Sequence, residues 1–403
     1  MNSDHSYMLS RVQSVFTPGS PVDAYTLFAG RTNQVQEILR AIRSKGQHVA
    51  LFGERGVGKT SLANVLGDIL GNALPVVVVK ITASRGDTFS DIWRRIGRDI
   101  KYNIQTQSIG FEPHQKQSPA SLEEELGSAR TPDDISYILK QISVPLVLVI
   151  DEFDRTSGGD VTRLMADCIK ILSDNAVSTT IILVGVANDI DDLVAEHASI
   201  DRALIQVRMP RMSPPELEEI ISRGEAESGI SFDPRARQMC VRLAQGLPHY
   251  THLLALYSSE RALDSQRIPV NSQDVRDSIQ TALDKAQQST QSLYHKATSS
   301  PRRDNLYTEV LTACALAQTD ALGYFAPSDV RDPMQKVTGK PYGIGAYAQH
   351  LRDLCLDIRG PVLERTGTER RYRYRFINPL MQPYVLLNSI VTGSLSEGDI
   401  GLG

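Results

Sequence analysis

The sequence lacks the features of a disulfide-bonded or membrane-spanning protein. Its four cysteines, Cys168, Cys240, Cys314 and Cys355, are scattered and form no C-x-x-C pair, so neither a disulfide framework nor a zinc site is expected. The longest apolar runs, such as LPVVVVKI and TIILVGVA, are far shorter than the roughly 20 residues of a membrane helix. The beginning, MNSDHSYMLS, has no basic region followed by an apolar stretch, so no signal peptide is expected. These absences predict a cytoplasmic protein that does not contact a membrane.

The chain also lacks an excess of positive charge. Its net charge is −4 and its pI is about 6.1, so any contact with nucleic acid should be local rather than spread over the surface. With 403 residues the chain is too long for one compact domain, and two or three domains are expected.

What the sequence does contain is an alternation of apolar runs and amphipathic segments in its first half. β-Branched and apolar runs with little alternation are typical of strands buried on both faces of a parallel sheet. Helical patterns lie between them, which predicts an α/β domain with a five-stranded parallel sheet. The segment 103–130 is polar and weakly patterned, and we expect a surface excursion there. The five expected strands are 48–53, 75–81, 145–150, 179–187 and 203–209.

After Pro210 the pattern changes to consecutive amphipathic helices, which predict a helical lid. From Leu306, three helical patterns precede two short strand patterns and a last helix, an arrangement typical of a winged-helix domain. The expected organisation is an N-terminal segment (1–22), an α/β nucleotide-binding domain (23–210), the lid (211–297), a linker (298–303), the winged helix (304–390) and a disordered tail (391–403).

The stretch GERGVGKTSL matches the phosphate-binding pattern G-x-x-x-x-G-K-[ST], with a strand before it and a helix after it. Its glycines allow backbone N–H groups to surround phosphates, Lys59 reaches the β- and γ-phosphates, and the Thr60 hydroxyl binds Mg²⁺. ATP or ADP and Mg²⁺ are the expected cofactors. The predicted loop contacts to nucleotide are Gly53, Glu54, Arg55, Gly56, Val57, Gly58, Lys59, Thr60 and Ser61.

Polar residues that follow two later strands complete a hydrolytic set. In LVLVIDEFD, Asp151 is expected to hold Mg²⁺ through water, and Glu152 to orient and deprotonate the attacking water. Asp154 is a helix cap or supporting partner. Asn188 closes the next strand, where its amide can sense the γ-phosphate, although Asn-Asp also suits a simple turn.

The order of these motifs resembles the AAA+ ATPases, most closely the origin-recognition and cell-division-control initiators. FAGR at 28–31 resembles the family's adenine-side GR box, which implies nucleotide contacts by Gly30 and Arg31. The resemblance also implies a lid, a winged helix and self-association through nucleotide-bridged interfaces. Arg202 matches the family's arginine finger, which acts on ATP in a neighbouring subunit; an ordinary surface ion pair is the alternative. Arg208, Arg211 and Arg223 are weaker candidates for the finger.

One stretch departs from that family. The initiators carry a sensor arginine just after a glycine at the start of a lid helix, whereas this chain has GLPHY at 246–250. GLPHY resembles the G-x-P motif of STAND signalling ATPases, which implies that Pro248 packs on the nucleotide base. His249 can touch phosphate or simply occupy the helix N-terminus. The missing arginine predicts slow turnover and a long-lived bound state.

The winged-helix region is mildly basic, with 12 Lys and Arg against 9 Asp and Glu over 301–386. In RYRYRF the strand period of two places arginines on one face and aromatics on the other. We therefore predict a slow ATPase switch that binds duplex DNA through this domain. The alternative is a STAND-like ATPase whose winged helix docks a protein effector. The candidate DNA-contacting residues are Arg352, Arg370, Arg371, Arg373 and Arg375.

Overall fold

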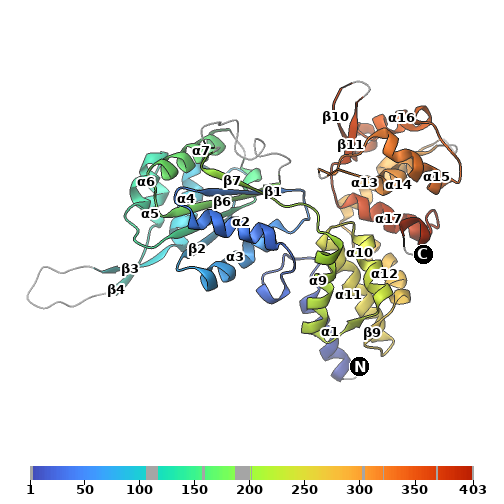
Figure 1. The fold of residues 1–403 in the computed structure, drawn as a ribbon, viewed down its shortest axis with the longest axis horizontal. Helices are drawn as coiled ribbons and strands as arrows, with labels where there is room; N and C mark the ends of the chain where they lie inside the picture. The colour runs from blue at the N-terminus through green and yellow to red at the C-terminus, as the bar shows by residue number, and fades with distance from the viewer. Residues whose placement is uncertain are drawn as a thin grey trace, which may run out of the picture. The chain divides into compact units, whose positions relative to one another are not determined.

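The computed structural model describes residues 3–105, 117–156, 159–186, 200, 202–301, 305–320, 322–368 and 371–401. The chain divides into two compact units (Figure 1). The first, called here the α/β unit, comprises Val22–Glu54 and Lys59–Met209. The second, called here the helical unit, comprises the residues before Val22, the loop Arg55–Gly58, and the chain from Pro210 onward.

The α/β unit is built on a five-stranded parallel sheet in the order β2-β5-β6-β1-β7. This confirms the predicted fold class. The sheet strands are β1 (His48–Gly53), β2 (Val77–Thr82), β5 (Leu146–Asp151), β6 (Thr179–Val186) and β7 (Leu204–Arg208). Around them lie η1 (Tyr25–Leu27), α2 (Thr32–Arg43), α3 (Lys59–Ala73), α4 (Phe89–Asp99), α5 (Glu123–Ser128), α6 (Pro132–Leu139), η2 (Phe153–Arg155) and α7 (Gly159–Asp174).

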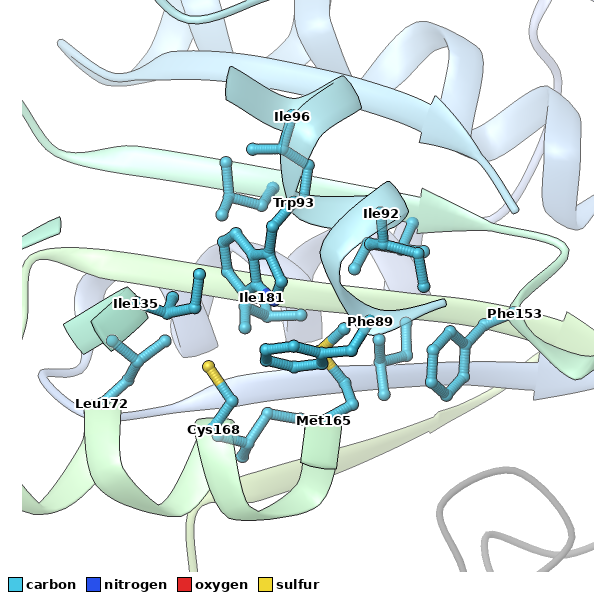
Figure 2. Packing of buried hydrophobic residues seen from close by; sticks show 14 of the residues in the cluster. Phe89, Ile92, Trp93, Ile96, Ile135, Phe153, Met165, Cys168, Leu172 and Ile181 are labelled. Carbon is cyan, nitrogen blue, oxygen red and sulfur yellow. The ribbon is translucent and has the colours of Figure 1, made fainter. Parts of the chain in front are cut away.

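Alternate residues of each strand serve the two faces of this sheet. On one face, Trp93 of α4 is fully buried and packs with Phe89, Ile135, Met165 and Ile181 (Figure 2). Helices α2 and α3 contact the sheet with their own buried apolar residues. Both faces are therefore covered, which explains the apolar runs that the sequence displays.

The segment predicted as a surface excursion is only partly one. Strands β3 (Lys101–Gln105) and β4 (Gln117–Ser121) form a separate antiparallel pair. After them the chain returns to the core, where Leu122 and Leu126 are buried against α4. The prediction of a surface segment to residue 130 was therefore wrong from residue 122, because two leucines among many polar residues suffice to anchor a short helix.

The helical unit contains the lid helices and the winged helix together. Its lid elements are α9 (Pro214–Ser228), β8 (Ser231–Phe232), α10 (Pro234–Ala244), α11 (Pro248–Asp264), β9 (Pro269–Val270), α12 (Ser272–Lys285) and α13 (Gln288–Thr298), preceded in sequence by α1 (Ser3–Val15). The winged helix comprises α14 (Tyr307–Leu316), η3 (Pro327–Val330), α15 (Arg331–Thr338), α16 (Ile344–Asp353), η4 (Asp357–Arg359), β10 (Leu363–Thr366), β11 (Arg373–Phe376) and α17 (Met381–Val391). Phe325 forms an isolated antiparallel β-bridge with Tyr374 of β11.

Helix α17 joins these two parts. It contacts α10, α12, α13 and α14, and the Tyr250 hydroxyl of α11 donates to the Leu380 carbonyl at its start, at 2.9 Å. The chain beyond α17, which the sequence placed in a disordered tail, is ordered over its described part. There Leu395 is buried, and Glu397, just before η5 (Gly398–Ile400), forms ion pairs with Arg276 and Arg235.

Among the described residues, no helix has both the length and the apolar character that crossing a membrane requires.

Candidate nucleotide site

The loop between β1 and α3 has the backbone that phosphate binding requires. Gly56 and Gly58 have φ of +85° and +93°, a region that side chains with a Cβ enter only at a cost. Gly53 is needed for space, because a Cβ there would lie 2.4 Å from the Met209 carbonyl oxygen. Lys59 is buried, and its Nζ donates to the carbonyls of Gly53 at 2.9 Å and Glu54 at 2.7 Å. The loop thus presents backbone N–H groups and one oriented ammonium to an anion.

Asp151 ends β5 at the carboxyl edge of the sheet and is 2% exposed. Its Oδ1 accepts a hydrogen bond from the Glu152 N–H at 2.9 Å. Its Oδ2 is buried and accepts no hydrogen bond from the residues that the structure describes, and the Lys80 Nζ lies 3.4 Å from it. A buried carboxylate oxygen of this kind suits a hydrated Mg²⁺, with the Thr60 hydroxyl as the expected second protein group.

Glu152 is held in an unusual conformation. Its φ and ψ are +55° and +34°, the left-handed region that non-glycine residues rarely adopt. Its carboxylate is partly exposed and pairs with Arg155 at 2.9 Å. Backbone strain of this kind persists only where the surrounding structure imposes it, and it is concentrated at functional sites.

Asp154 links the end of β5 to the end of β6. Its Oδ1 accepts from the Val186 N–H at 2.8 Å, which fixes the last residue of β6. The predicted sensor, Asn188, lies two residues further along and outside the described residues. Asp154 is therefore a supporting partner of the strand that leads to Asn188, one of the two roles predicted for it.

The segment before the GR box attaches to the helix that follows the phosphate loop. The Ser61 hydroxyl, predicted to contact nucleotide, accepts from the Val22 N–H at 3.1 Å. Gly30 and Arg31 both have left-handed backbones, with φ of +65° and +64°, and Arg31 is 2% exposed at the N-cap of α2. Arg31 is thus buried in the fold, and Ser61 binds the backbone of Val22, at the end of the segment before the GR box.

The GLPHY stretch begins helix α11, with Pro248 at its first position. Gly246 has φ of +78°, and a Cβ there would lie 2.8 Å from Arg211 Cβ. His249 Nδ1 lies 2.9 Å from the Pro18 carbonyl oxygen, and burial lowers the pKa of this imidazole. Burial therefore favours the neutral form of the ring, which is bonded to the N-terminal segment.

The candidate arginine fingers differ in their surroundings. Arg202 is exposed in the turn before β7, where its carbonyl accepts from Gln47 at 2.8 Å. Arg211 donates to the Gln245 carbonyl at 3.3 Å and to Gln382 at 2.5 Å, and Arg223 pairs with Glu219 at 2.6 Å. Arg208 ends β7, and its carbonyl accepts from Gln34 at 3.4 Å.

The arginines of the wing are largely engaged within the domain. Arg373 pairs with Asp320 at 2.9 Å, and Arg375 pairs with Glu364 while its guanidinium lies over the Tyr324 ring.

Other basic side chains near the wing are placed differently. Arg371 is exposed, whereas Arg370 lies outside the described residues. On α16, Arg352 donates to Gln349 at 2.6 Å. On the predicted aromatic face Tyr374 and Phe376 are buried, whereas Tyr372 is half-buried.

Sequence reasoning missed Lys80 and Asn64. Lys80 lies on β2, and its ammonium donates to Asn64 Oδ1 of α3 and faces Asp151. The signal was the single charged residue inside the apolar run PVVVVKI.

The fold and the loop define a P-loop NTPase of the AAA+ class. A family model described as "Novel STAND NTPase 1" (nSTAND1) matches residues 21–318, and the chain belongs to that family. It is similar to the RuvB subunit of the Holliday junction branch migration complex from Anaeromyxobacter sp. (strain Fw109-5), with 24% identity over 251 residues. That match covers 61% of this chain and 61% of the relative, so less than two thirds of the relative's length is spanned.

Two solved structures share the architecture. The ORC2 protein of Aeropyrum pernix, described as ADPNP–ADP complexes, aligns with a TM-score of 0.51 and 14% identity, over 96% of this chain and 97% of that chain. The Walker-type ATPase PABY2304 of Pyrococcus abyssi aligns with a TM-score of 0.51 and 16% identity, over 92% of this chain and 99% of that chain. The predicted resemblance to AAA+ ATPases of the origin-recognition type is confirmed for the fold.

Proposed function

We propose that this protein is a slow ATPase that uses ATP binding as a switch. Lys59 holds the β- and γ-phosphates, Thr60 and Asp151 hold Mg²⁺, and Glu152 orients the attacking water. The observation that carries the proposal is the acid pair at the end of β5. There a buried carboxylate oxygen that accepts no hydrogen bond from the described part of the chain stands beside a glutamate in a left-handed conformation.

Two contacts support slow turnover. Glu152 is paired with Arg155, so the general base must leave this pair before it can take a proton from water. The lid position where the initiators carry an arginine holds Pro248 and His249, and His249 is half-buried with its Nδ1 at 2.9 Å from the Pro18 carbonyl oxygen. Without that arginine, loss of the γ-phosphate is coupled less strongly to the lid.

Completion of the site requires two further residues. Asn188 is proposed as the sensor of the γ-phosphate. Arg202, exposed before β7, is proposed as the finger that reaches ATP in a neighbouring copy. Self-association should therefore depend on ATP and on Arg202.

The test is Glu152→Gln, which keeps the shape of the side chain and removes its basicity. We expect phosphate release to fall by about 100-fold or more, while ATP binding remains, because general-base catalysis typically contributes that much. Asp160→Asn is the matched control, since Asp160 is an exposed acid that pairs with Arg163 three residues later, as Glu152 does with Arg155. Hydrolysis at the wild-type rate by Glu152→Gln would contradict the proposal.

As the output of the switch we propose duplex DNA binding by the winged helix. The fold of this domain and the similarity to a protein named for Holliday junction branch migration support it. Arg371 is an exposed arginine at the wing, so Arg371→Ala should weaken binding and reduce its salt slope by about one. Arg373→Ala should have a smaller effect, because Asp320 already neutralises that charge. ATP-dependent mobility shifts with the Glu152→Gln protein measure both effects.

A protein effector is the second candidate. The observation that favours it is the internal pairing of Arg373 and Arg375 with acids, which leaves the wing less positive than its sequence suggests. The Glu152→Gln protein purified with ATP distinguishes the two outputs. Sequencing detects bound DNA, and mass spectrometry detects a protein that remains after nuclease treatment.

A further inference from the structure

A lysine stands beside the aspartate of the magnesium site. Lys80 lies on β2, which is hydrogen-bonded to β5. Thr82, two residues further along β2, pairs in register with Asp151. The Lys80 ammonium is 3.4 Å from Asp151 Oδ2, the buried oxygen that accepts no hydrogen bond from the described residues. We propose that Lys80 is a positioning residue that lowers the affinity of the nucleotide site for Mg²⁺; this rests on the proposed ATPase function.

The geometry holds the lysine where it is. Its Nζ donates to Asn64 Oδ1, and Asn64 Nδ2 donates in turn to the Val22 carbonyl at 3.3 Å. Asn64 lies on α3, four residues after Thr60 and one helical turn from it. The ammonium is thus fixed between the helix that carries one expected magnesium group and the strand end that carries the other.

The electrostatic consequence has a definite sign. Asp151 Oδ1 is already bonded to the Glu152 N–H, so Oδ2 is the oxygen left for the metal. A cation 3.4 Å from that oxygen neutralises the carboxylate when no metal is present and repels a divalent cation that approaches it. Removal of the lysine charge leaves a buried carboxylate uncompensated, which raises the attraction for Mg²⁺.

The same contacts extend to the segment before the GR box. Val22 is bonded at its carbonyl by Asn64 and at its N–H by Ser61. Lys80 would yield its place at Asp151 to a bound Mg²⁺, and its partner Asn64 holds Val22. Lys80 therefore also connects metal occupancy with the anchoring of this segment.

The experiment titrates Mg²⁺ into protein that was freed of metal with EDTA and follows the affinity for fluorescent mant-ADP. The measured quantity is the midpoint, the Mg²⁺ concentration that gives half of the full increase in affinity. Lys80→Met keeps the length of the side chain and removes its charge. We expect the midpoint to fall by about tenfold or more, within the range that outer-shell substitutions produce in metal affinity. Lys80→Arg keeps the charge and should retain the wild-type midpoint. Lys45→Met, at an exposed lysine of the same unit, should leave the midpoint unchanged.

A second readout separates this effect from damage to the fold. In EDTA the Lys80→Met protein should melt below the wild type, and Mg²⁺ with ADP should raise its melting temperature by more than it raises the wild type's. In an Asp151→Asn background the Lys80→Met change should no longer move the midpoint. An unchanged or higher midpoint in folded Lys80→Met protein overturns the inference alone. Failure of the wild type to bind mant-ADP in either condition overturns the proposed ATPase function as well.

Discussion

From the left-handed backbone at Glu152 we predict that a glycine variant is more stable than an alanine variant, which reverses their usual order of stability. In the middle of a helix or strand, a protein with glycine is less stable than the same protein with alanine by about 0.5–1 kcal/mol, because glycine loses more backbone entropy on folding. At Glu152, with φ of +55°, alanine retains the cost of the left-handed conformation and glycine does not. We therefore expect Glu152→Gly to be more stable than Glu152→Ala.

The size of the difference follows from two terms. Relief of the left-handed conformation contributes about 1–2 kcal/mol, and the entropy of glycine opposes it by about 0.5–1 kcal/mol. The net advantage of glycine is about 0.5–1 kcal/mol. The ion pair with Arg155 does not enter, because both substitutions remove it equally and exposed pairs contribute little. For a unit of roughly 150–250 residues this corresponds to about 1–4 °C in melting temperature.

The assay is thermal unfolding of both variants, followed at the transition that ADP raises, since ligand binding identifies the unit that holds the site. Arg155 offers a matched control three residues after Glu152, outside the left-handed region. There Arg155→Ala should be the more stable of the alanine and glycine variants. An order at Glu152 that equals the order at Arg155 would refute the argument from strain.

Two further predictions concern the helical unit. Phe16 is 1% exposed and packs between Phe232 and His252. Phe16→Ala should lower the free energy of unfolding by about 3–5 kcal/mol and release α1, which hydrogen exchange over residues 3–16 would report as faster exchange. Unchanged exchange there would contradict the packing. Burial lowers the pKa of His252 from 6.5 to about 4, so the unfolded chain binds the proton first and stability is lost as pH falls from about 6.5 to about 4. His252→Gln should show a shallower loss over that interval in denaturant titrations, and an equally steep loss would exclude this histidine as the cause.

Local sequence patterns were enough for much of the α/β unit. The glycines at 56 and 58 signal left-handed backbone, and Thr131 with Pro132 and Asp134 forms a capping box at the start of α6. Such features depend on residues within one turn of each other, so a single stretch of sequence encodes them. The positions of the sheet strands along the chain were accessible for the same reason, through runs of apolar residues buried on both faces, whereas their order in the sheet was not.

The contacts that decide the behaviour of the site were not accessible in this way. The sequence predicted three arginines on one face of the wing, but Asp320, which neutralises Arg373, lies 53 residues earlier in the chain and belongs to no motif. The left-handed backbone at Glu152 likewise has no signature in its residue type.

By itself, the sequence determined the phosphate loop, the acid pair after β5 and the alternation of strands and helices, because each is written in neighbouring residues. The tertiary structure alone decided which charges stand beside the magnesium aspartate and which arginines remain exposed. Lys80, Asn64 and Asp151 come from a strand, a helix and a second strand, and they meet only because the sheet order places β2 against β5. Charge interactions weaken with the distance between the groups, so their partners are fixed only when the chain is folded.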